Sequence, residues 1–194
     1  MVPKTCEMPD LSVLDSRLAR FLITAVLAGD PGLSPKEGLY RRNFVRLVDQ
    51  AVKEYEDARI ALIELIGISG NEFLTGGWEL FFRFVRHLEN CINATNRAIR
   101  TMERIKSEPG SLAVPKIARR LIKSISDDIR ELRDAIEHMD EIIQKDGLTG
   151  EQPVMLGIGE PGDRLILARY YVRFADLATT LRKLNEVAHL LVQV

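Results

Sequence analysis

The feature that most constrains this fold is a set of three long stretches whose apolar residues recur with the 3.6-residue period of an α-helix. The stretches span residues 39–68, 78–107 and 115–145, and breaks that contain glycine or proline separate them. At a rise of 1.5 Å per residue, each predicted helix is about 45 Å long. Helices of similar length joined by short breaks bury their apolar stripes side by side, so the pattern predicts an antiparallel bundle.

The pattern changes after the third stretch. Residues 154–158 and 164–168 are short β-like runs around a turn signal at 160–163, and they predict a β-hairpin. A last helix is predicted over residues 171–191. The expected fold class is therefore all-α: an antiparallel bundle of long helices with a small C-terminal β-hairpin and a terminal helix.

The chain of 194 residues suits one domain with a sizeable core. Before the bundle, residues 11–28 are predicted to form a first helix with Asp10 as its N-cap. Within a single domain, 1–194, we expect three parts: the N-terminal helix and loop at 1–37, the core long helices at 38–147, and the hairpin with the last helix at 148–194.

Charge and composition narrow the function classes. The formal net charge is −1, so any contact with RNA must rely on local basic patches rather than on the field of the whole protein. The apolar run at 21–28 is too short to span a bilayer, and the two cysteines form no disulfide framework, which favours a cytoplasmic protein. The sequence shows no metal-ligand spacing and no phosphate-binding loop, so we expect neither a metal nor a cofactor.

Chemistry is indicated most directly by Arg133 and His138, which have four residues between them inside a predicted helix. A guanidinium is a permanent cation shaped to grip phosphate oxygens, and an imidazole moves protons near neutral pH. Asp134 lies four residues before His138, where its carboxylate can accept a hydrogen bond from one ring nitrogen. Together these side chains are a minimal set for cleaving RNA without a metal.

Helical geometry leaves an alternative open. An offset of five residues turns an ideal helix by about 140°, so Arg133 and His138 do not share a narrow face. A symmetric dimer would improve this geometry by pooling two arginines and two histidines in one cleft. The alternative is a solvated helix face on which Arg130, Asp134 and Glu137 pair at helical spacing.

The sequence around these residues resembles a known family. The pattern Arg-Asp-x-x-x-His at 133–138, continued by Met139-Asp140-Glu141, is similar to the signature of the HEPN superfamily of helical bundles, and most similar to its abortive-infection-related branch. Residues 78–89, and a hairpin followed by a terminal helix, also resemble that branch. The resemblance implies a homodimeric, metal-independent endoribonuclease with a defence or toxin role and room for an antitoxin partner.

The resemblance also implies roles for individual residues. Arg133 would bind and stabilise the scissile phosphate, His138 would act as acid or base on the ribose hydroxyl or the leaving oxygen, and Asp134 would orient the site. Some family members carry a tyrosine two residues after the histidine, where a partner nucleotidyltransferase modifies it. Asp140 stands at that position here, so we do not expect this mode of regulation.

Other basic residues are further candidates for binding substrate. Arg86 and His87, in the predicted helix before the one that carries the motif, are candidates together with Arg130. The alternative for His87 is a surface or interface histidine without a role in binding. A basic cluster would either follow an RNA backbone or form a solvated helix face: Lys116, Arg119, Arg120 and Lys123. The glycine pattern at 157–162 fits a dinucleotide fingerprint, but Pro161 interrupts it, so we interpret it as a turn.

Two hypotheses from different classes follow. The first is a metal-independent endoribonuclease that uses arginine and histidine in a dimeric cleft. The second is a non-catalytic helical dimer that serves as a binding or regulatory scaffold. They differ in whether Arg133 and His138 cooperate at one phosphodiester.

Overall fold

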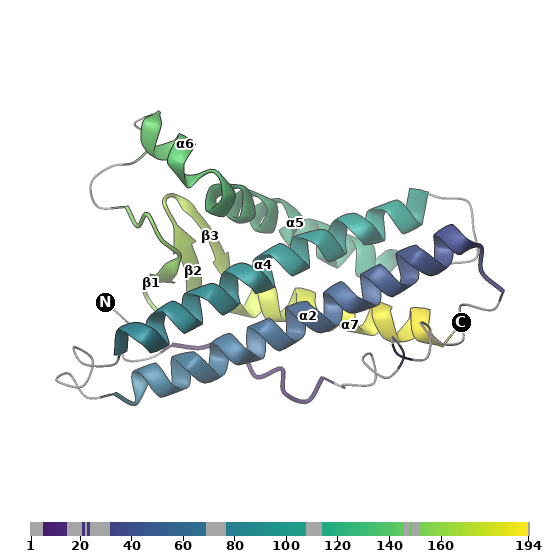
Figure 1. The fold of residues 1–194 in the computed structure, drawn as a ribbon, viewed down its shortest axis with the longest axis horizontal. Coiled ribbons are helices and arrows are strands. Elements are labelled where there is room, and N and C mark those ends of the chain that lie inside the picture. The colour runs from purple at the N-terminus through teal and green to yellow at the C-terminus, as the bar shows by residue number, and fades with distance from the viewer. Residues whose placement is uncertain are drawn as a thin grey trace.

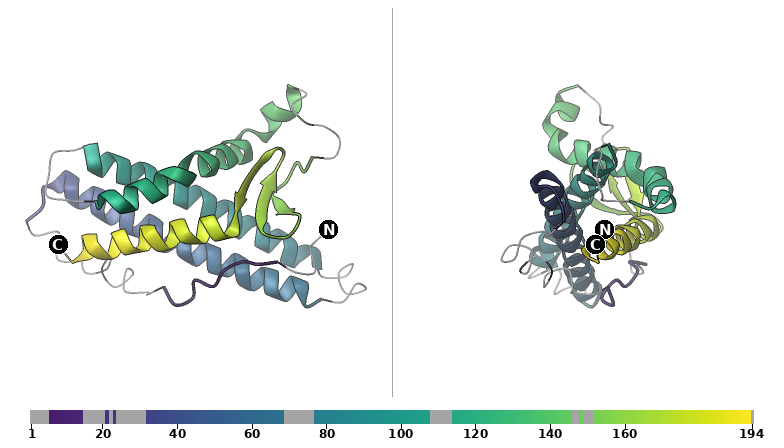
Figure 2. Two further views of the ribbon diagram at one scale, coloured as in Figure 1. Left: turned by 180° about the vertical axis from the view of Figure 1, so that it is seen from behind. Right: turned by 90° about the vertical axis from the view of Figure 1, so that its right-hand side faces the viewer.

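The computed structural model describes residues 6–14, 21, 23, 32–68, 77–107, 114–145, 148 and 152–193. Four long helices form its body: α2 (Pro35–Ile66), α4 (Trp78–Ser107), α5 (Lys116–Glu137) and α7 (Phe174–Val192). They lie side by side and alternate in direction along the long axis (Figures 1 and 2). The predicted all-α bundle with a small C-terminal sheet and a terminal helix is confirmed.

The start of α2 differs from the prediction, because the helix begins at Pro35 and not at residue 39. The Ser34 hydroxyl accepts a hydrogen bond from the Glu37 amide (3.3 Å), and the Glu37 carboxylate accepts one from the Ser34 amide (2.9 Å). This capping box satisfies two amides at the open helix end, and proline is tolerated in a first turn because its missing N–H is not needed there. Pro35, which we expected in the loop that ends at residue 37, therefore lies in the helix.

The N-terminal segment (residues 6–14) contradicts the prediction of a helix that begins at residue 11. Asp10 does not cap a helix; its carboxylate accepts hydrogen bonds from the amide and hydroxyl two residues on, at 2.8 and 2.6 Å, which closes a local turn. Leu11, predicted to open the apolar stripe of that helix, is instead fully buried in the main core. The rest of the predicted helix, 11–28, lies largely outside the described residues.

The helix predicted over residues 115–145 is not continuous in the structure. α5 ends at Glu137, His138 leaves helical geometry with φ −118° and ψ 30°, and the short helix α6 (Met139–Gln144) follows. α6 buries none of its residues and projects from one end of the bundle (Figures 1 and 2). Ile143, which we expected to face inward, is 51% exposed. The helical period continues beyond the bundle, where Met139 and Ile142 are only partly buried against the core.

Three short strands form an antiparallel sheet in the order β1-β2-β3: β1 (Gly157–Gly159), β2 (Arg164–Leu167) and β3 (Tyr170–Arg173). The predicted hairpin is confirmed in β1 and β2, but its first strand begins at Gly157 and not at residue 154. Its turn uses Gly162 at φ 104°, a conformation that glycine adopts readily. β3 occupies residues predicted to open the last helix, so α7 begins at Phe174 and not at residue 171. The buried pair Leu165 and Val172 belongs to the face that packs on α5.

The core lies between the four long helices. The N-terminal segment and all four long helices contribute its largest fully buried side chains: Leu11, Phe44, Leu47, Tyr55, Leu62, Phe84, Leu88, Ile92, Ile122, Ile129 and Phe174. The apolar period of residues 78–107 predicts that Trp78 faces inward, but at the start of α4 it is 50% exposed. In the described part of the chain, no helix combines the length and the apolar character that a membrane crossing requires.

Candidate functional site

Arg133 lies near the C-terminal end of α5, where two carboxylates of the same helix contact its guanidinium. Nη1 donates a hydrogen bond to Asp134 Oδ1 at 2.9 Å, and Nη2 pairs with the Glu137 carboxylate one turn further on. The arginine side chain is 26% exposed. A pair four residues apart, such as Arg133 and Glu137, contributes only about 0.2–0.5 kcal/mol on a helix surface. An incoming phosphate would compete with both carboxylates for the guanidinium.

His138 lies at the junction of α5 and α6 and is 54% exposed. Its Nδ1 is 3.3 Å from Glu141 Oε1, and the other oxygen of that carboxylate is 3.3 Å from Lys145 Nζ. A carboxylate beside Nδ1 favours the tautomer that carries its proton there. Nε2 is then the ring nitrogen that can accept a proton from a substrate.

The predicted hydrogen bond between Asp134 and His138 is not formed. The Asp134 carboxylate binds Arg133, and only its backbone carbonyl contacts residue 138, by accepting a hydrogen bond from the His138 amide at 2.9 Å. The His138 ring instead lies beside Glu141, three residues further along the chain. Glu141 occupies the orienting position instead. Its spacing of three residues from His138 is the signal that would have found it.

Arg133 and His138 therefore lie at the same end of α5, but each has its own carboxylate partners. We call Arg133, Asp134, Glu137, His138 and Glu141 the α5-end cluster. Within the described residues, no hydrogen bond or ion pair joins Arg133 to His138. The cluster is assembled from neighbours along the chain, at the end of the helix from which α6 projects (Figure 1).

The local charge around this cluster is negative. Residues 127–141 contain seven carboxylates and only two arginines. Arg130, predicted to bind substrate, is 59% exposed and pairs with Asp127 at 2.8 Å, one turn away from the cluster. The alternative was a ladder in which Arg130, Asp134 and Glu137 pair. In the structure Arg130 pairs with Asp127, and Asp134 and Glu137 pair with Arg133 instead. This acidic setting opposes the approach of a polyanion.

Arg86 and His87, the other two candidates for binding substrate, face different surroundings on α4. His87 Nδ1 is 2.7 Å from Glu54 Oε2 of α2, and both side chains are about one-fifth exposed, at 19% and 20%. Arg86 lines a groove with Met155. Within the described residues, neither side chain has a hydrogen bond or ion pair with the α5-end cluster. His87 is an interface histidine between two helices, which is the alternative that the sequence left open.

The basic cluster at 116–123 lies at the opposite end of α5 from His138. From Arg120 to Arg133 the helix rises about 20 Å, so the basic cluster and the candidate catalytic pair do not share one compact site. The glycine pattern at 157–162 forms β1 and the turn after it, as predicted. It does not open a helix, which a dinucleotide-binding loop would require.

Further chemical features of the described residues are their cysteine thiols and possible metal ligands. Cys6 and Cys91 carry free thiols. Burial raises the pKa of the Cys6 thiol to about 11 and that of the Cys91 thiol to about 12, so neither is a thiolate at neutral pH. No group of three or more His, Cys, Asp or Glu side chains capable of holding a metal ion occurs among the residues that the structure describes.

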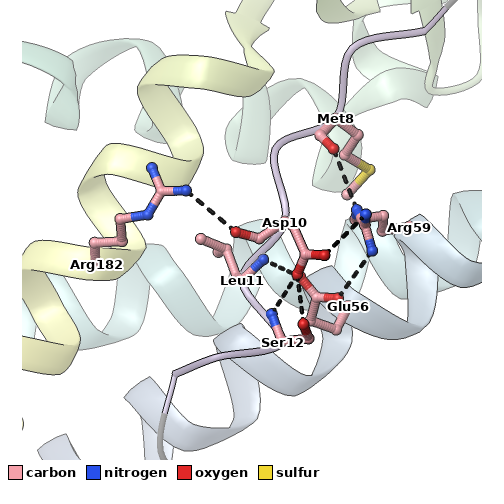
Figure 3. A network of polar contacts seen from close by, with 7 residues as sticks. All are labelled: Met8, Asp10, Leu11, Ser12, Glu56, Arg59 and Arg182. Carbon is pink, nitrogen blue, oxygen red and sulfur yellow. Dashed lines mark hydrogen bonds and ion pairs between the residues drawn. The ribbon is translucent and has the colours of Figure 1, made fainter.

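A second polar network, which sequence reasoning missed, holds the N-terminal segment against α2 and α7 (Figure 3). Arg59 of α2 donates from Nε to the Met8 carbonyl at 3.3 Å, and its Nη2 lies 3.1 Å from Asp10 Oδ2. The Glu56 carboxylate accepts a hydrogen bond from the Leu11 amide at 2.5 Å. From the other side, Arg182 of α7 donates to the Asp10 carbonyl at 3.2 Å. These contacts fix backbone atoms of the segment, so their role is structural.

No protein-family model, no curated protein and no solved structure matches this chain.

Proposed function

We propose that this protein is a metal-independent endoribonuclease of HEPN type, with Arg133 and His138 as its reactive groups. The observation that carries the proposal is their placement: a guanidinium and an imidazole lie at the same accessible end of α5, each beside a carboxylate that can position it. A permanent cation stabilises a phosphorane-like transition state, and an imidazole transfers protons near neutral pH.

The proposed reaction needs no group beyond these side chains and the RNA. The 2′-oxygen attacks the neighbouring phosphorus as Nε2 of His138 takes the hydroxyl proton, and the bond from phosphorus to the 5′-oxygen breaks. The imidazolium then gives this proton to the leaving 5′-oxygen, and a cyclic phosphate end remains. Arg133 binds the non-bridging oxygens, after the phosphate displaces Asp134 and Glu137 from its guanidinium. Glu141 keeps the imidazole in the reactive tautomer.

A second copy of the chain is part of the proposal. Arg133 and His138 of one chain have separate partners, so a cleft that pools both pairs would place four functional groups around one phosphodiester. A defence or toxin role, and an antitoxin that restrains it, are proposed from the family resemblance alone.

A second function, that of a non-catalytic helical scaffold, is favoured by one specific observation. Arg133 is already neutralised by two carboxylates, within a segment of seven carboxylates and two arginines. A surface of this charge suits a basic protein partner better than a nucleic acid.

Cleavage of a mixed RNA pool by the purified full chain in excess chelator distinguishes the two functions. The endoribonuclease predicts cyclic phosphate ends, and it predicts that Arg133→Ala and His138→Ala each lower the cleavage rate by at least about a hundredfold. Matched controls are Arg97→Ala, an exposed arginine of α4, and His189→Ala on α7, which should cleave at the wild-type rate. Cleavage that survives both cluster substitutions, or intact RNA with the wild-type chain, would refute the nuclease and favour the scaffold.

A further inference from the structure

The first turns of α4 carry a cluster of aromatic rings that is partly open to solvent. Trp78 lies with its ring centre 6.2 Å from those of Phe81 and Phe82, and the two phenylalanine centres are 5.9 Å apart. Trp78 is 50% and Phe82 53% exposed. Large exposed rings in contact with one another mark interaction surfaces, because a soluble monomer has little reason to keep them in water.

A groove of about 550 Å³ lies beside these rings, between α4 and the segment that leads into β1. Its apolar part comes from Phe82, Val85 and Met155, and Met155 is itself 38% exposed. Four charged side chains complete its lining: Glu79, Arg83, Arg86 and Glu89. An apolar floor with a charged rim is the composition of a protein–protein interface.

The signs of these charges argue against a nucleic acid as the occupant. Two glutamates and two arginines cancel, so the groove has no net positive charge to attract phosphates. Arg83 is also engaged by Glu64 of α2 through an ion pair. Burial raises the pKa of Glu89, which marks this carboxyl as partly withdrawn from solvent. Glu79 and Arg86 then remain as the exposed charges on either side of Phe82.

We propose that this face of α4 is the interface between two copies of the chain. The order of charges is self-complementary when α4 meets its mate antiparallel, with the twofold axis between Phe82 and Arg83. Glu79 and Arg86 lie equally far on either side of that point, so each Glu79 faces Arg86 of the second copy, and the two aromatic clusters meet at the centre. A parallel arrangement would instead place like charges opposite one another.

The inference deepens the proposed function, which calls for a second copy, but its evidence comes from α4 alone. The aromatic cluster, the end of α5 and α6 all lie toward the same end of the long axis (Figures 1 and 2). The oligomeric state is measured without RNA, so the interface and the nuclease can fail independently of each other.

Charge exchange tests the interface on the full chain by sedimentation velocity. Glu79→Lys and Arg86→Glu each place like charges opposite one another, and each should raise the dimer dissociation constant by about tenfold or more. Combining the two substitutions in one chain restores opposite charges and should restore the dimer. Mixing the two single variants should likewise give a heterodimer. In that pair the introduced lysine faces the introduced glutamate, and the unchanged Arg86 of one chain faces the unchanged Glu79 of the other.

Glu103→Lys is the matched control, because Glu103 is an exposed glutamate on the other half of α4, and it should leave the dimer unchanged. Thermal unfolding of each variant checks that the chain is folded. As a second measurement, Phe82→Cys places a thiol beside the twofold axis and should give a disulfide-linked dimer on mild oxidation, whereas Glu103→Cys should not. A wild-type chain that is monomeric at about 100 µM, a dimer indifferent to both reversals, or variants that do not recover on mixing would overturn the inference.

Discussion

Two arginines of similar exposure show how differently one residue type is used in this molecule. Arg59 is 23% exposed and Arg133 is 26% exposed. Arg59 makes polar contacts with Met8 and Asp10, which lie about fifty positions earlier in the chain, whereas the polar partners of Arg133 among the described residues lie within four positions of it. Arg59 joins the N-terminal segment to α2, whereas Arg133 pairs with carboxylates of its own helix.

This difference separates contacts that hold the fold from contacts that a ligand can replace. The Arg59 network holds the N-terminal segment, in which Leu11 is fully buried, against α2. The pairs around Arg133 can open without moving any other element, because the helix itself supplies both partners. A side chain that is held but not structurally needed is suited to bind a substrate.

The largest expected effect is on stability, from Leu11→Ala. Leu11 is fully buried although its segment is not helical, so truncation leaves a cavity in the main core and should lower the free energy of unfolding by about 2–4 kcal/mol. Denaturant unfolding measures the loss. Val13→Ala in the same segment is the control, because Val13 is 84% exposed, and it should cost less than about 0.5 kcal/mol. Equal losses for the two variants would show that the segment is not docked.

The second prediction compares the two arginines directly. Arg59→Ala removes a hydrogen bond to the Met8 carbonyl and the partner of Asp10, so it should lower the free energy of unfolding by about 1–3 kcal/mol. Arg133→Ala removes only local surface pairs and should cost less than about 1 kcal/mol. Both values come from denaturant unfolding under one set of conditions. A larger loss from Arg133→Ala would contradict the division between the two regions.

The third prediction is a pH dependence that belongs to the N-terminal segment. The pKa of Asp10 is lowered, chiefly by the hydrogen bond from the Ser12 hydroxyl, then by that from the Ser12 amide, with a smaller contribution from Arg59. The stabilisation is therefore present above the ordinary pKa of aspartate and is lost as pH falls through the lower value of the folded state. Asp10→Asn should lose less stability than wild type between about pH 5 and pH 3, because it has no carboxylate to protonate at this position.

Denaturant unfolding at each pH measures this difference, with the stability of each chain taken relative to its own value at the higher pH. Identical acid profiles for wild type and Asp10→Asn would exclude this role for the Asp10 carboxylate.

The smallest expected change in stability is that of Glu137→Gln, and it rests on the proposed function. Removing one carboxylate from Arg133 should change the free energy of unfolding by less than about 0.5 kcal/mol. It should also strengthen RNA binding a few-fold, because the phosphate then has one competitor fewer. Fluorescence anisotropy with labelled RNA, in the His138→Ala background so that the RNA stays intact, measures the change. Weaker binding would indicate that Glu137 supports the site instead of competing with its ligand.

The parts of the fold that local pattern encodes were predictable. The predicted helix at 78–107 matches α4 at both ends, because its apolar period and its flanking glycines and proline are all local signals. The turn at 160–163 was also predictable, because proline, glycine and aspartate follow one another there. The break at His138 was not, because the sequence keeps its helical period through residue 143 and carries no local signal for a break.

The candidate site was predictable as a set of residues but not as a set of contacts. Arg133 and His138 were identified from their chemistry, whereas Glu141 was missed because the expected partner, Asp134, lay at the right spacing in an unbroken helix. Arg59, Glu56 and the Met8 carbonyl gave no signal at all, because nothing in the sequence shows that residues fifty positions apart will meet.

By itself, the sequence determined which segments are long helices, where the hairpin turns and which side chains have useful chemistry. Those properties depend on interactions among residues a few positions apart. Only the tertiary structure decided that Leu11 lies in the core without being helical, that residues 170–173 add a third strand, and that α5 ends at Glu137. Each of these follows from how much apolar surface a distant element can cover, and local propensity does not contain that information.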